Sequence, residues 1–584
     1  MIAQVVLDLP IDGPFDYLIP ENLTGQISVG RRVKVSFGPR PQIGFVVGIL
    51  KESPIAKLKT VISLVDNAPA FTQVDLDFAH QFCAYYGCSL GEALFVILRN
   101  KEGQPITIQK DRLPGITYHH CFPDGYVKQI EKIIDGYHGS QSFKQGEKRF
   151  LILVPDAFRG QRLIQEFKGM GAVNIGMRSS VFESDGQFDC VIMIDEENSS
   201  YKQEQTPMYE TRHVLMMRSH LLGFDIAFIG VSPSIEMMAL INESKVRWIE
   251  GANSKSIRTK VVDLTNYKFV PGLISPPLRD ALENALKSGK KCLLVLNRKG
   301  SYRITRCVGC AEILKCKHCD SPLIYSRSEA KYLCRHCTFT APSDTICPQC
   351  RQSNWKSIGI GVEQLQTELK KQFFNARIQS FERHREIAGE LRKPLSEFDI
   401  LIATSAVLRF QGSLKVQLAA FIDFDAEINR LDMRSAFNAF SLAIHISSMA
   451  IDPIFIQTRH INHYVLQHLS HGNIKDYYDE ELKLRKEFGF SPFKHWIKIN
   501  WRGKFEKPTQ EAAQQVYQEL ISLNSEHIHI TPPLIDSIGR KRDQYRFNVM
   551  VQTNHVPSTI TQIKSILKKV KRPSRVILTF NIDP

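Results

Sequence analysis

Eight of the 13 cysteines fall in one short block, and their spacing is typical of metal ligands. They form four Cys-x2-Cys pairs: Cys307 with Cys310, Cys316 with Cys319, Cys334 with Cys337, and Cys347 with Cys350. A pair with this spacing can place both sulfurs on one tetrahedral metal, and two pairs complete a four-cysteine site. The block therefore predicts two zinc sites, with iron–sulfur clusters or unligated thiols as the alternatives.

The predicted metal is structural, because no coordination position is left open for water. His318 and His336 lie within pairs that are complete without them, so a surface position is the simpler interpretation for both. The remaining five cysteines are scattered along the chain. A secreted protein built on disulfides would spread its cysteines over the chain that they link, and this chain does not.

The charge balance favours a polyanionic partner. Lys and Arg number 75 against 60 Asp and Glu, a formal net charge of +15, and nucleic acid is the usual partner of such a chain. With 43% hydrophobic and 23% charged residues, the composition is that of a globular protein. The first residues do not resemble a signal peptide, and no apolar run reaches the roughly 18 residues of a membrane span. We expect a cytoplasmic protein without a membrane segment.

The elements that must position these residues differ along the chain. Short apolar segments at 5–7, 15–19, 33–37 and 45–48, separated by Gly and Pro, predict a small β-barrel or sandwich at the start. A helical period follows over 74–86. Residues 101–125 are polar and contain three prolines, which favours a linker.

Continuous apolar runs then alternate with helical segments, as in parallel sheets whose strands are buried on both faces. These runs cover 150–155, 191–194, 226–230, 293–296, 378–381, 400–402 and 421–423. Two α/β lobes, the second interrupted by the cysteine block, are the simplest arrangement. A last unit ends in a predicted strand at 576–580, so the whole chain is expected to be a multidomain α/β protein.

The cysteine steps of 3, 6, 3, 15, 3, 10 and 3, which follow the segment 294–300, closely resemble those of the primosomal protein N′ (PriA) family. Members of this family are zinc-containing superfamily 2 DNA helicases that restart stalled bacterial replication forks. The resemblance runs nearly end to end. It is carried by 15–20, 33–38, 58–61, 85–86 and 90–94, by 195–197, 199–204 and 230–236, and by 477–482, 489–493 and 581–584.

The resemblance implies a division of the chain and of its cysteines. The expected parts are a 3′-end DNA-binding β domain (1–100), a linker with a reduced winged-helix region (101–125), a first helicase-like lobe (126–255), the start of a second lobe (256–306), the zinc insertion (307–350), the rest of the second lobe (351–468), and an α+β C-terminal domain (469–584). In the insertion, Cys307, Cys310, Cys347 and Cys350 would form an outer zinc site, and Cys316, Cys319, Cys334 and Cys337 an inner one.

By position, Phe15, Asp16, Gly38 and Lys59 correspond to the residues that line the family's pocket for a terminal nucleotide. An aromatic ring can stack on a base and a lysine can meet a phosphate. The Asp16 carboxylate can accept a hydrogen bond from a 3′-hydroxyl. Without the resemblance, a core position for Phe15 and a solvated one for Lys59 would be the simpler interpretation.

The ATP motifs of the family are degenerate in this chain. No Gly-x4-Gly-Lys-Ser/Thr string exists, although its amides, lysine and hydroxyl are what hold phosphate and magnesium. At the expected place of this loop stands 136–144, and Asn198 replaces a histidine of the family. The final motif, expected at 444–450, has no arginine.

Asp195 and Glu196 are the vestige of the magnesium-binding motif, and no catalytic residue is expected. An acidic turn at the start of a helix, capped by Asn198 or Ser199, is the simpler interpretation of this pair.

Together these features predict a DNA-binding replication-restart protein with two Zn²⁺ ions and without bound ATP or Mg²⁺. It would recognise forked DNA, single strands and 3′ ends and act as a scaffold for loading the replicative helicase. Its partners by resemblance are primosome proteins, the replicative helicase or its loader, and single-stranded DNA-binding protein. One alternative is an active ATP-dependent 3′-5′ DNA helicase with an atypical nucleotide site. Another is a structural zinc-ribbon protein that binds nucleic acid.

Overall fold

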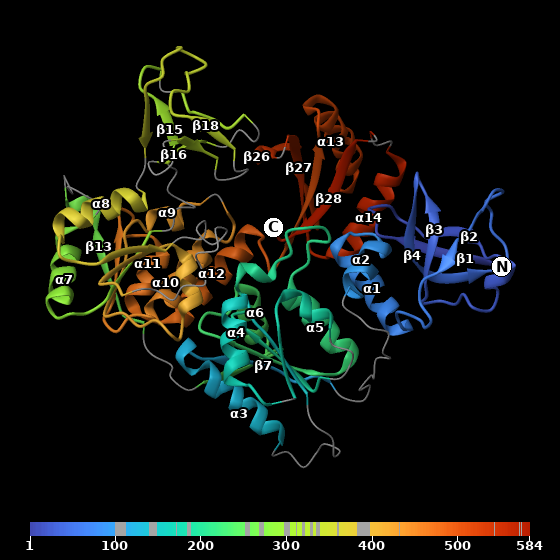
Figure 1. Cartoon of the computed structure of the whole chain (residues 1–584), viewed down its shortest axis with the longest axis horizontal. Helices are drawn as coiled ribbons and strands as arrows, with labels where there is room; N and C mark the ends of the chain where they lie inside the picture. Colours follow the sequence, from blue (N-terminus) through green and yellow to red (C-terminus); the bar gives the residue numbers. More distant parts are fainter. Residues whose placement is uncertain are drawn as a thin grey trace.

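The computed structural model describes residues 1–99, 113–138, 149–170, 172–183, 188–251, 257–267, 274–296, 304–310, 312–317, 322–326, 331–334, 339–358, 361–381, 397–430, 432–541, 543–570, 573 and 575–584. The N-terminal sheet lies at one end of the long axis and the second α/β unit at the other (Figure 1). Within the described ranges, no helix combines the length and the apolar character needed to cross a membrane.

The N-terminal part is a sheet with the strand order β5-β2-β1-β4-β3-β6. Its strands are β1 (Ile2–Leu7), β2 (Phe15–Leu18), β3 (Arg32–Phe37), β4 (Arg40–Leu50), β5 (Lys59–Thr60) and β6 (Ser63–Leu64). Alternate residues such as Val33 and Val35 are fully buried on one face, which is why this segment forms strands. The predicted β-rich start is confirmed. Two helices follow, α1 (Gln73–Tyr86) and α2 (Leu90–Ile97), each with a capping box at its start.

The first α/β unit is a parallel sheet with the order β12-β7-β11-β10-β8-β9. Its strands are β7 (Ile116–His120), β8 (Phe150–Leu153), β9 (Val173–Gly176), β10 (Cys190–Ile194), β11 (Asp225–Gly230) and β12 (Arg247–Glu250). Its helices are α3 (Tyr126–His138), α4 (Ala157–Glu166), α5 (Thr211–Leu222) and α6 (Ile235–Asn242). The fully apolar runs of β8, β10 and β11 are buried throughout, as predicted.

The predicted linker over 101–125 is wrong in its second part, and residues 101–112 lie outside the described ranges. β7 is an inner strand, with Tyr118 fully buried. This strand was not predicted because it contains polar residues, which form hydrogen bonds inside the unit. His119 lies 3.0 Å from the Thr117 hydroxyl and 2.9 Å from the Gln129 amide. The first α/β unit therefore begins at β7 and not at residue 126.

The second α/β unit repeats this design, with the parallel order β13-β23-β22-β14-β21-β20. Its strands are β13 (Thr259–Asp263), β14 (Cys292–Val295), β20 (Ile378–Phe381), β21 (Ile400–Ala403), β22 (Leu418–Phe421) and β23 (Ile454–Thr458). Its helices are α7 (Pro276–Lys287), α8 (Val362–Gln372), α9 (Asp425–Ile428), α10 (Ser435–Ser447) and α11 (Tyr464–His471). The strand predicted at 421–423 ends at Phe421 instead, because the buried run extends backwards through two alanines.

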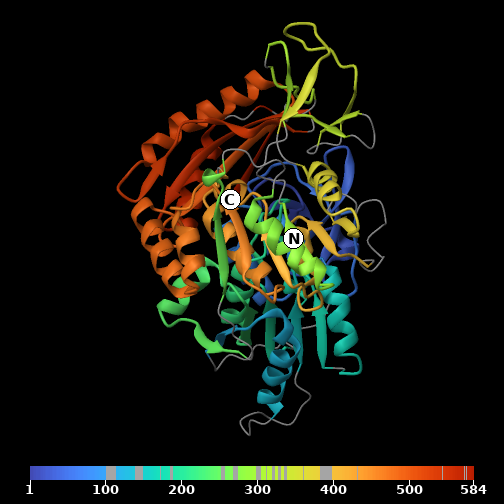
Figure 2. The same cartoon turned by 90° about the vertical axis from the view of Figure 1, so that its left-hand side faces the viewer.

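The cysteine block projects from the second unit and stands clear of it in both views (Figures 1 and 2). Its strands are β15 (Ile304–Cys307), β16 (Ile324–Ser326), β17 (Lys331–Leu333), β18 (Thr340–Pro342) and β19 (Trp355–Ile358). β15 pairs with β19, and β16, β17 and β18 form a separate antiparallel sheet.

The C-terminal part is an antiparallel sheet with the order β25-β27-β24-β28, and β26 also pairs with β27. Its elements are α12 (Ile474–Phe488), β24 (His495–Gly503), α13 (Glu506–Leu520), β25 (Ile528–Ile530), β26 (Leu534–Lys541), β27 (Gln544–Thr553), α14 (Val556–Lys569) and β28 (Val576–Ile582). The predicted closing strand is confirmed as β28. The α12 helix packs on both α/β units: the rings of Tyr477 and Phe440 of the second unit stack with centroids 3.6 Å apart, and the Tyr478 hydroxyl donates to the Pro233 carbonyl of the first.

Candidate metal centre, DNA-end pocket and cleft between the α/β units

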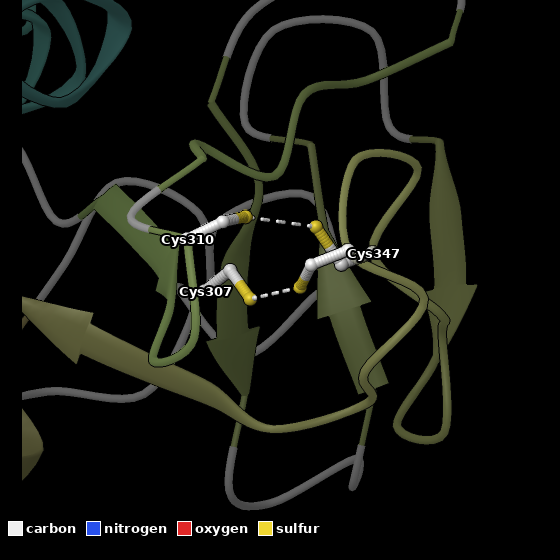
Figure 3. A group of neighbouring side chains, drawn as sticks. Cys307, Cys310 and Cys347 are labelled. Carbon is white, nitrogen blue, oxygen red and sulfur yellow. Dashed lines mark hydrogen bonds between the residues drawn. The ribbon is translucent and has the colours of Figure 1, made fainter.

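Four cysteines of the insertion come together from two turns. Cys307 and Cys310 lie at the end of β15, and Cys347 and Cys350 lie in the turn before β19. Their sulfur atoms all lie within 4.8 Å of one another. The Sγ atoms of Cys307 and Cys350 are 3.4 Å apart, and those of Cys310 and Cys347 are 3.5 Å apart (Figure 3). Four sulfurs about 2.3 Å from a tetrahedral zinc are about 3.8 Å from one another, so this cluster has the size of a closed four-thiolate site.

Backbone hydrogen bonds hold both turns of this cluster. The amide of Cys307 donates to the carbonyl of Glu312 and that of Cys347 to the carbonyl of Gln352, each at 2.8 Å. The amide of Cys310 donates toward the Cys307 sulfur and, with the neighbouring thiols, lowers the pKa of Cys307 to about 7. The pKa of Cys310 and that of Cys350 shift upward instead, so these shifts do not by themselves favour the metal-binding thiolate form of the whole cluster.

The predicted inner site is only half described. Cys316 and Cys334 are buried beside Leu323 and Tyr332 in the small core of the insertion. Cys319 and Cys337 lie outside the described residues, as do His318 and His336. The second site therefore stays a prediction.

Three of the four residues predicted to bind a DNA end are brought together by the N-terminal sheet. Phe15 begins β2, which pairs in parallel with β5, so that Lys59 lies opposite Tyr17. Lys59 Nζ lies 3.5 Å from the carbonyl oxygen of Ser36, near the end of β3. The ring of Phe15 lies 4.9 Å from that of Phe37, the residue before Gly38.

Gly38 forms the turn between β3 and β4 with a φ of +66°, a conformation that other residues adopt at a cost. It is exposed, with no atom within 4 Å of the place of a Cβ, so the surface beside Phe15 and Lys59 stays open.

Asp16, the fourth residue, already has partners within the sheet. Ser53 Oγ donates to its Oδ2 at 2.5 Å, and Gln4 Nε2 lies 3.4 Å from its Oδ1. Successive residues of a strand point to opposite faces, so Asp16 and Phe15 do not share a face. A ligand hydroxyl would have to share this carboxylate with Ser53.

Asp195 and Glu196 stand in a turn before a short 3-10 helix, and both are buried, being only 1% and 2% exposed. Each carboxylate is neutralised by an arginine of the same unit: Arg159 donates to Asp195, and Arg212 Nη1 donates to Glu196 Oε2 at 2.6 Å. Asn198 does act as a cap. Its side chain accepts a hydrogen bond of 3.0 Å from the Ser200 amide at the start of a 3-10 turn over Ser199–Tyr201.

The segment that faces Asp195 lies earlier in the chain than expected. A phosphate cradle follows a strand and precedes a helix. In the first unit this position is 121–125, between β7 and α3, where no lysine is present. Tyr126 begins α3 and donates its hydroxyl hydrogen to Asp195. The expected segment 136–144 is thus wrong in part: 136–138 end α3, and 139–144 lie outside the described ranges.

A hydrogen bond between the two α/β units lies beside Asp195. His445 Nε2 lies 2.7 Å from Glu197 Oε1, and Gln411 Nε2 donates to His445 Nδ1 at 2.8 Å. Because Nδ1 accepts, Nε2 carries the proton that is donated to Glu197. Burial raises the pKa of Glu197 to about 7, and the Asp195 charge acts in the same direction.

Sequence reasoning did not find Arg159 or the partnership of Glu197 with His445. Arg159 belongs to no motif, and its partners Asp195, Leu408 and Gln411 are distant in the chain. His445 stands in the segment 444–450, where the final motif of the family was expected, and the missing arginine there was the only signal. Nearby, a hollow of about 530 Å³ opens between the units, lined by Phe122, Arg258, Lys415, Ser447, Ser448, Ala450, Ile451 and Asp452.

Comparison with known proteins agrees with the resemblance noted in the sequence. Residues 4–99 match the 3'DNA-binding domain (3'BD) of PriA. The chain is 23% identical over 651 residues to the Replication restart protein PriA of Treponema pallidum, with 100% of this chain and 99% of that protein covered. The same identity holds over 731 residues for the PriA of Haemophilus influenzae, with equal coverage.

Among solved structures, the DUF1998 helicase MrfA bound to DNA and AMPPNP matches with a TM-score of 0.35 and 10% identity. That match covers 70% of this chain and 53% of the helicase.

Proposed function

We propose that this chain, a relative of the replication restart proteins named PriA over its whole length, binds branched DNA at stalled replication forks and recognises nascent 3′ ends. The observation that carries this proposal is the match of 4–99 to the 3'DNA-binding domain. It is supported by the ring contact of Phe15 with Phe37, the residue before Gly38, and by Lys59 Nζ at 3.5 Å from the Ser36 carbonyl oxygen. The net charge of +15 supports a nucleic-acid partner.

The N-terminal sheet would contact a DNA end on both faces of β2, because Phe15 and Asp16 point to opposite faces of that strand. The Phe15 ring, already packed on Phe37, offers a face on which a terminal base can stack. Lys59 is exposed and can meet a phosphate. Asp16 can accept the hydrogen bond of a free 3′-hydroxyl, and a blocked end has no such hydrogen to give.

Replacement of Asp16 tests this pocket. Asp16→Ala is expected to weaken binding to a fork with a free 3′-hydroxyl by about 3- to 10-fold, the effect of one lost hydrogen bond. The affinity for the same fork with a 3′-blocked end should change by less than about 2-fold, since that bond is absent there. Fluorescence anisotropy with both forks measures the difference.

The matched control is Asp77→Ala. Asp77 also accepts from a glutamine side chain, Gln73, but lies exposed on α1. The Asp77→Ala variant should bind both forks with the affinity of the wild type. An equal loss for Asp16→Ala on the two forks would make the 3′-end pocket wrong and Asp16 merely structural.

Fork binding should also depend steeply on salt. Each phosphate that a cation neutralises adds about 0.9 to the slope of log K against log salt on duplex DNA, because a counterion is released. Lys59→Ala is therefore expected to reduce the steepness of this slope by up to about 0.9, which is the contribution of one phosphate contact. Lys371→Ala, an exposed lysine on α8 of the second unit, is the control that should leave the slope unchanged. An unchanged slope for Lys59→Ala would remove Lys59 from the DNA contacts.

The other parts of the chain take their proposed roles from the same relationship. The two α/β units stand as degenerate helicase lobes, and the insertion as a module that holds two zinc ions. Cys307, Cys310, Cys347 and Cys350 would bind the first zinc, and the remaining four cysteines of the block the second. With no phosphate cradle and with Asp195 held by Arg159, the chain would bind forks as a scaffold for partners that load the replicative helicase.

One observation favours an active helicase as the second candidate. The hollow between the units contains Lys415 and Arg258 near Ser447 and Phe122, and cations beside an aromatic ring can receive a nucleotide. Lys415 already donates to Asp124 Oδ2 at 3.2 Å and to the Ser448 carbonyl at 2.7 Å, so less of its charge is available. Nucleotide binding and turnover decide between the two candidates.

A further inference from the structure

The cleft between the α/β units is bridged by one buried arginine. Arg159, on α4 of the first unit, forms an ion pair with Asp195 at the end of β10. Its Nη2 atom donates to the carbonyl oxygen of Leu408 at 2.8 Å and to Gln411 Oε1 at 2.9 Å. Leu408 and Gln411 belong to the second unit, at the 3-10 turn Ser405–Phe410. With 12% of its side chain exposed, Arg159 makes these bonds in a largely water-free setting.

Neighbouring contacts repeat this connection. Arg162, one turn along α4, donates to the carbonyl oxygens of Gln411 and Gly412, each at 3.2 Å. Gly412 has a φ of +75°, and a Cβ there would lie 2.8 Å from the carbonyl oxygen of Pro123 in the first unit. Only glycine allows the two backbones to approach so closely without displacement.

A hydrogen bond and an ion pair also cross the cleft. His445 of α10 donates to Glu197, and Arg434 Nη2 donates to Glu236 Oε1 of α6 at 2.8 Å. Apolar side chains from both units also share one buried core. Phe122, Val231, Ile235, Val407 and Phe421 belong to it.

We propose that these side chains hold the two α/β units permanently closed, with Arg159 as the central connection. An enzyme driven by nucleotide opens and closes because the nucleotide binds one arrangement more tightly than the other. Here the chain's own arginines supply the closing contacts, so a nucleotide is not needed for closure. Opening would break the hydrogen bonds of Arg159 to the Leu408 carbonyl and to Gln411, whereas the ion pair with Asp195 lies within the first unit and would stay.

This inference rests on the proposed function only in treating the cleft as a former nucleotide site. The closed arrangement itself is argued from contacts, and its test needs no DNA. It would give the fork-binding part and the C-terminal part a rigid platform, because the core of the first unit is continuous with both.

Hydrogen exchange of the full-length protein tests the connection, followed by mass spectrometry without DNA. In Arg159→Ala, amides of 190–201 and 405–412 are expected to exchange at least about 10-fold faster than in the wild type, because the cleft opens more often. Arg162→Ala should show a smaller increase in the exchange rate of the same peptides. This variant replaces Arg159→Ala in the test if Arg159→Ala does not fold. Adding ATP or ADP with Mg²⁺ to the wild type should change nothing in these peptides.

Arg377→Ala is the matched control. Arg377 makes a two-point ion pair with Asp399, with a shorter distance of 2.9 Å, entirely within the second unit. Its loss should leave the cleft peptides unchanged. The proposal is overturned if Arg159→Ala and Arg162→Ala exchange like Arg377→Ala, or if nucleotide slows exchange at the cleft of the wild type. A wild type that fails to bind forks would instead contradict the proposed function and leave these results intact.

Discussion

Removal of the metal from the purified protein is expected to unfold the insertion over 304–358 and to leave the rest of the chain folded. A structural zinc site contributes roughly 10–16 kcal/mol of apparent binding free energy at neutral pH, which far exceeds what a small core supplies. The described core of the insertion consists of little more than Leu314, Leu323, Tyr332 and Ala341 around two cysteines. The other cores are separate from it and do not depend on the metal.

Metal analysis and fluorescence together measure this effect. Freshly reduced protein should contain two zinc ions per chain. Trp355 Nε1 donates to the Thr345 carbonyl at 2.6 Å inside the insertion, so chelation should shift its emission as the indole becomes exposed. Cys307→Ser should lose one zinc, whereas Cys83→Ser, a cysteine outside the block, should keep both. One zinc or none in the wild type would overturn the two-site prediction.

No DNA-stimulated ATP turnover and no unwinding are expected from the wild-type chain. Turnover should stay below about 0.1 per second, a tenth of the usual lower range for kcat. Three parts of phosphoryl-transfer catalysis are missing together, so that no single neighbour can restore them. The cradle position 121–125 has no lysine, Asp195 is held by Arg159 and Tyr126, and 444–450 has no arginine. An arginine that reaches the γ-phosphate is typically worth ~10³–10⁵ in rate.

The measurement is ATP hydrolysis with single-stranded DNA, alongside equilibrium binding of a fluorescent nucleotide. The control for a contaminating enzyme is the double variant Asp195→Asn, Glu196→Gln. Activity above the stated limit that disappears in this variant would belong to the chain and would contradict the prediction. Activity that persists in the variant would come from elsewhere.

Much of the fold could be predicted because its signals are local. The buried strands β8, β10, β11, β14 and β21 contain short continuous apolar runs, which are typical of parallel strands covered on both faces. The four Cys-x2-Cys pairs are also a local signal, since a spacing of two residues allows both sulfur atoms of a pair to bind one metal. The family resemblance, with its N-terminal domain, also rests on short segments that stand in order along the chain.

Only the tertiary structure decided what became of the cleft. β7 escaped prediction because its polar residues are paired inside the protein, which polarity alone does not reveal. Asp195 is buried although an acidic turn was predicted there: Arg159 reaches it from 36 positions away, and Gln411 bonds to Arg159 from 252 positions away. Such contacts leave no periodic trace in the sequence, because a buried charge requires only that some partner meet it in space. The sequence by itself therefore determined most of the buried strands and the Cys-x2-Cys pairs that predict a metal site. The packing of the two α/β units against each other decided which side chains fill the space between them.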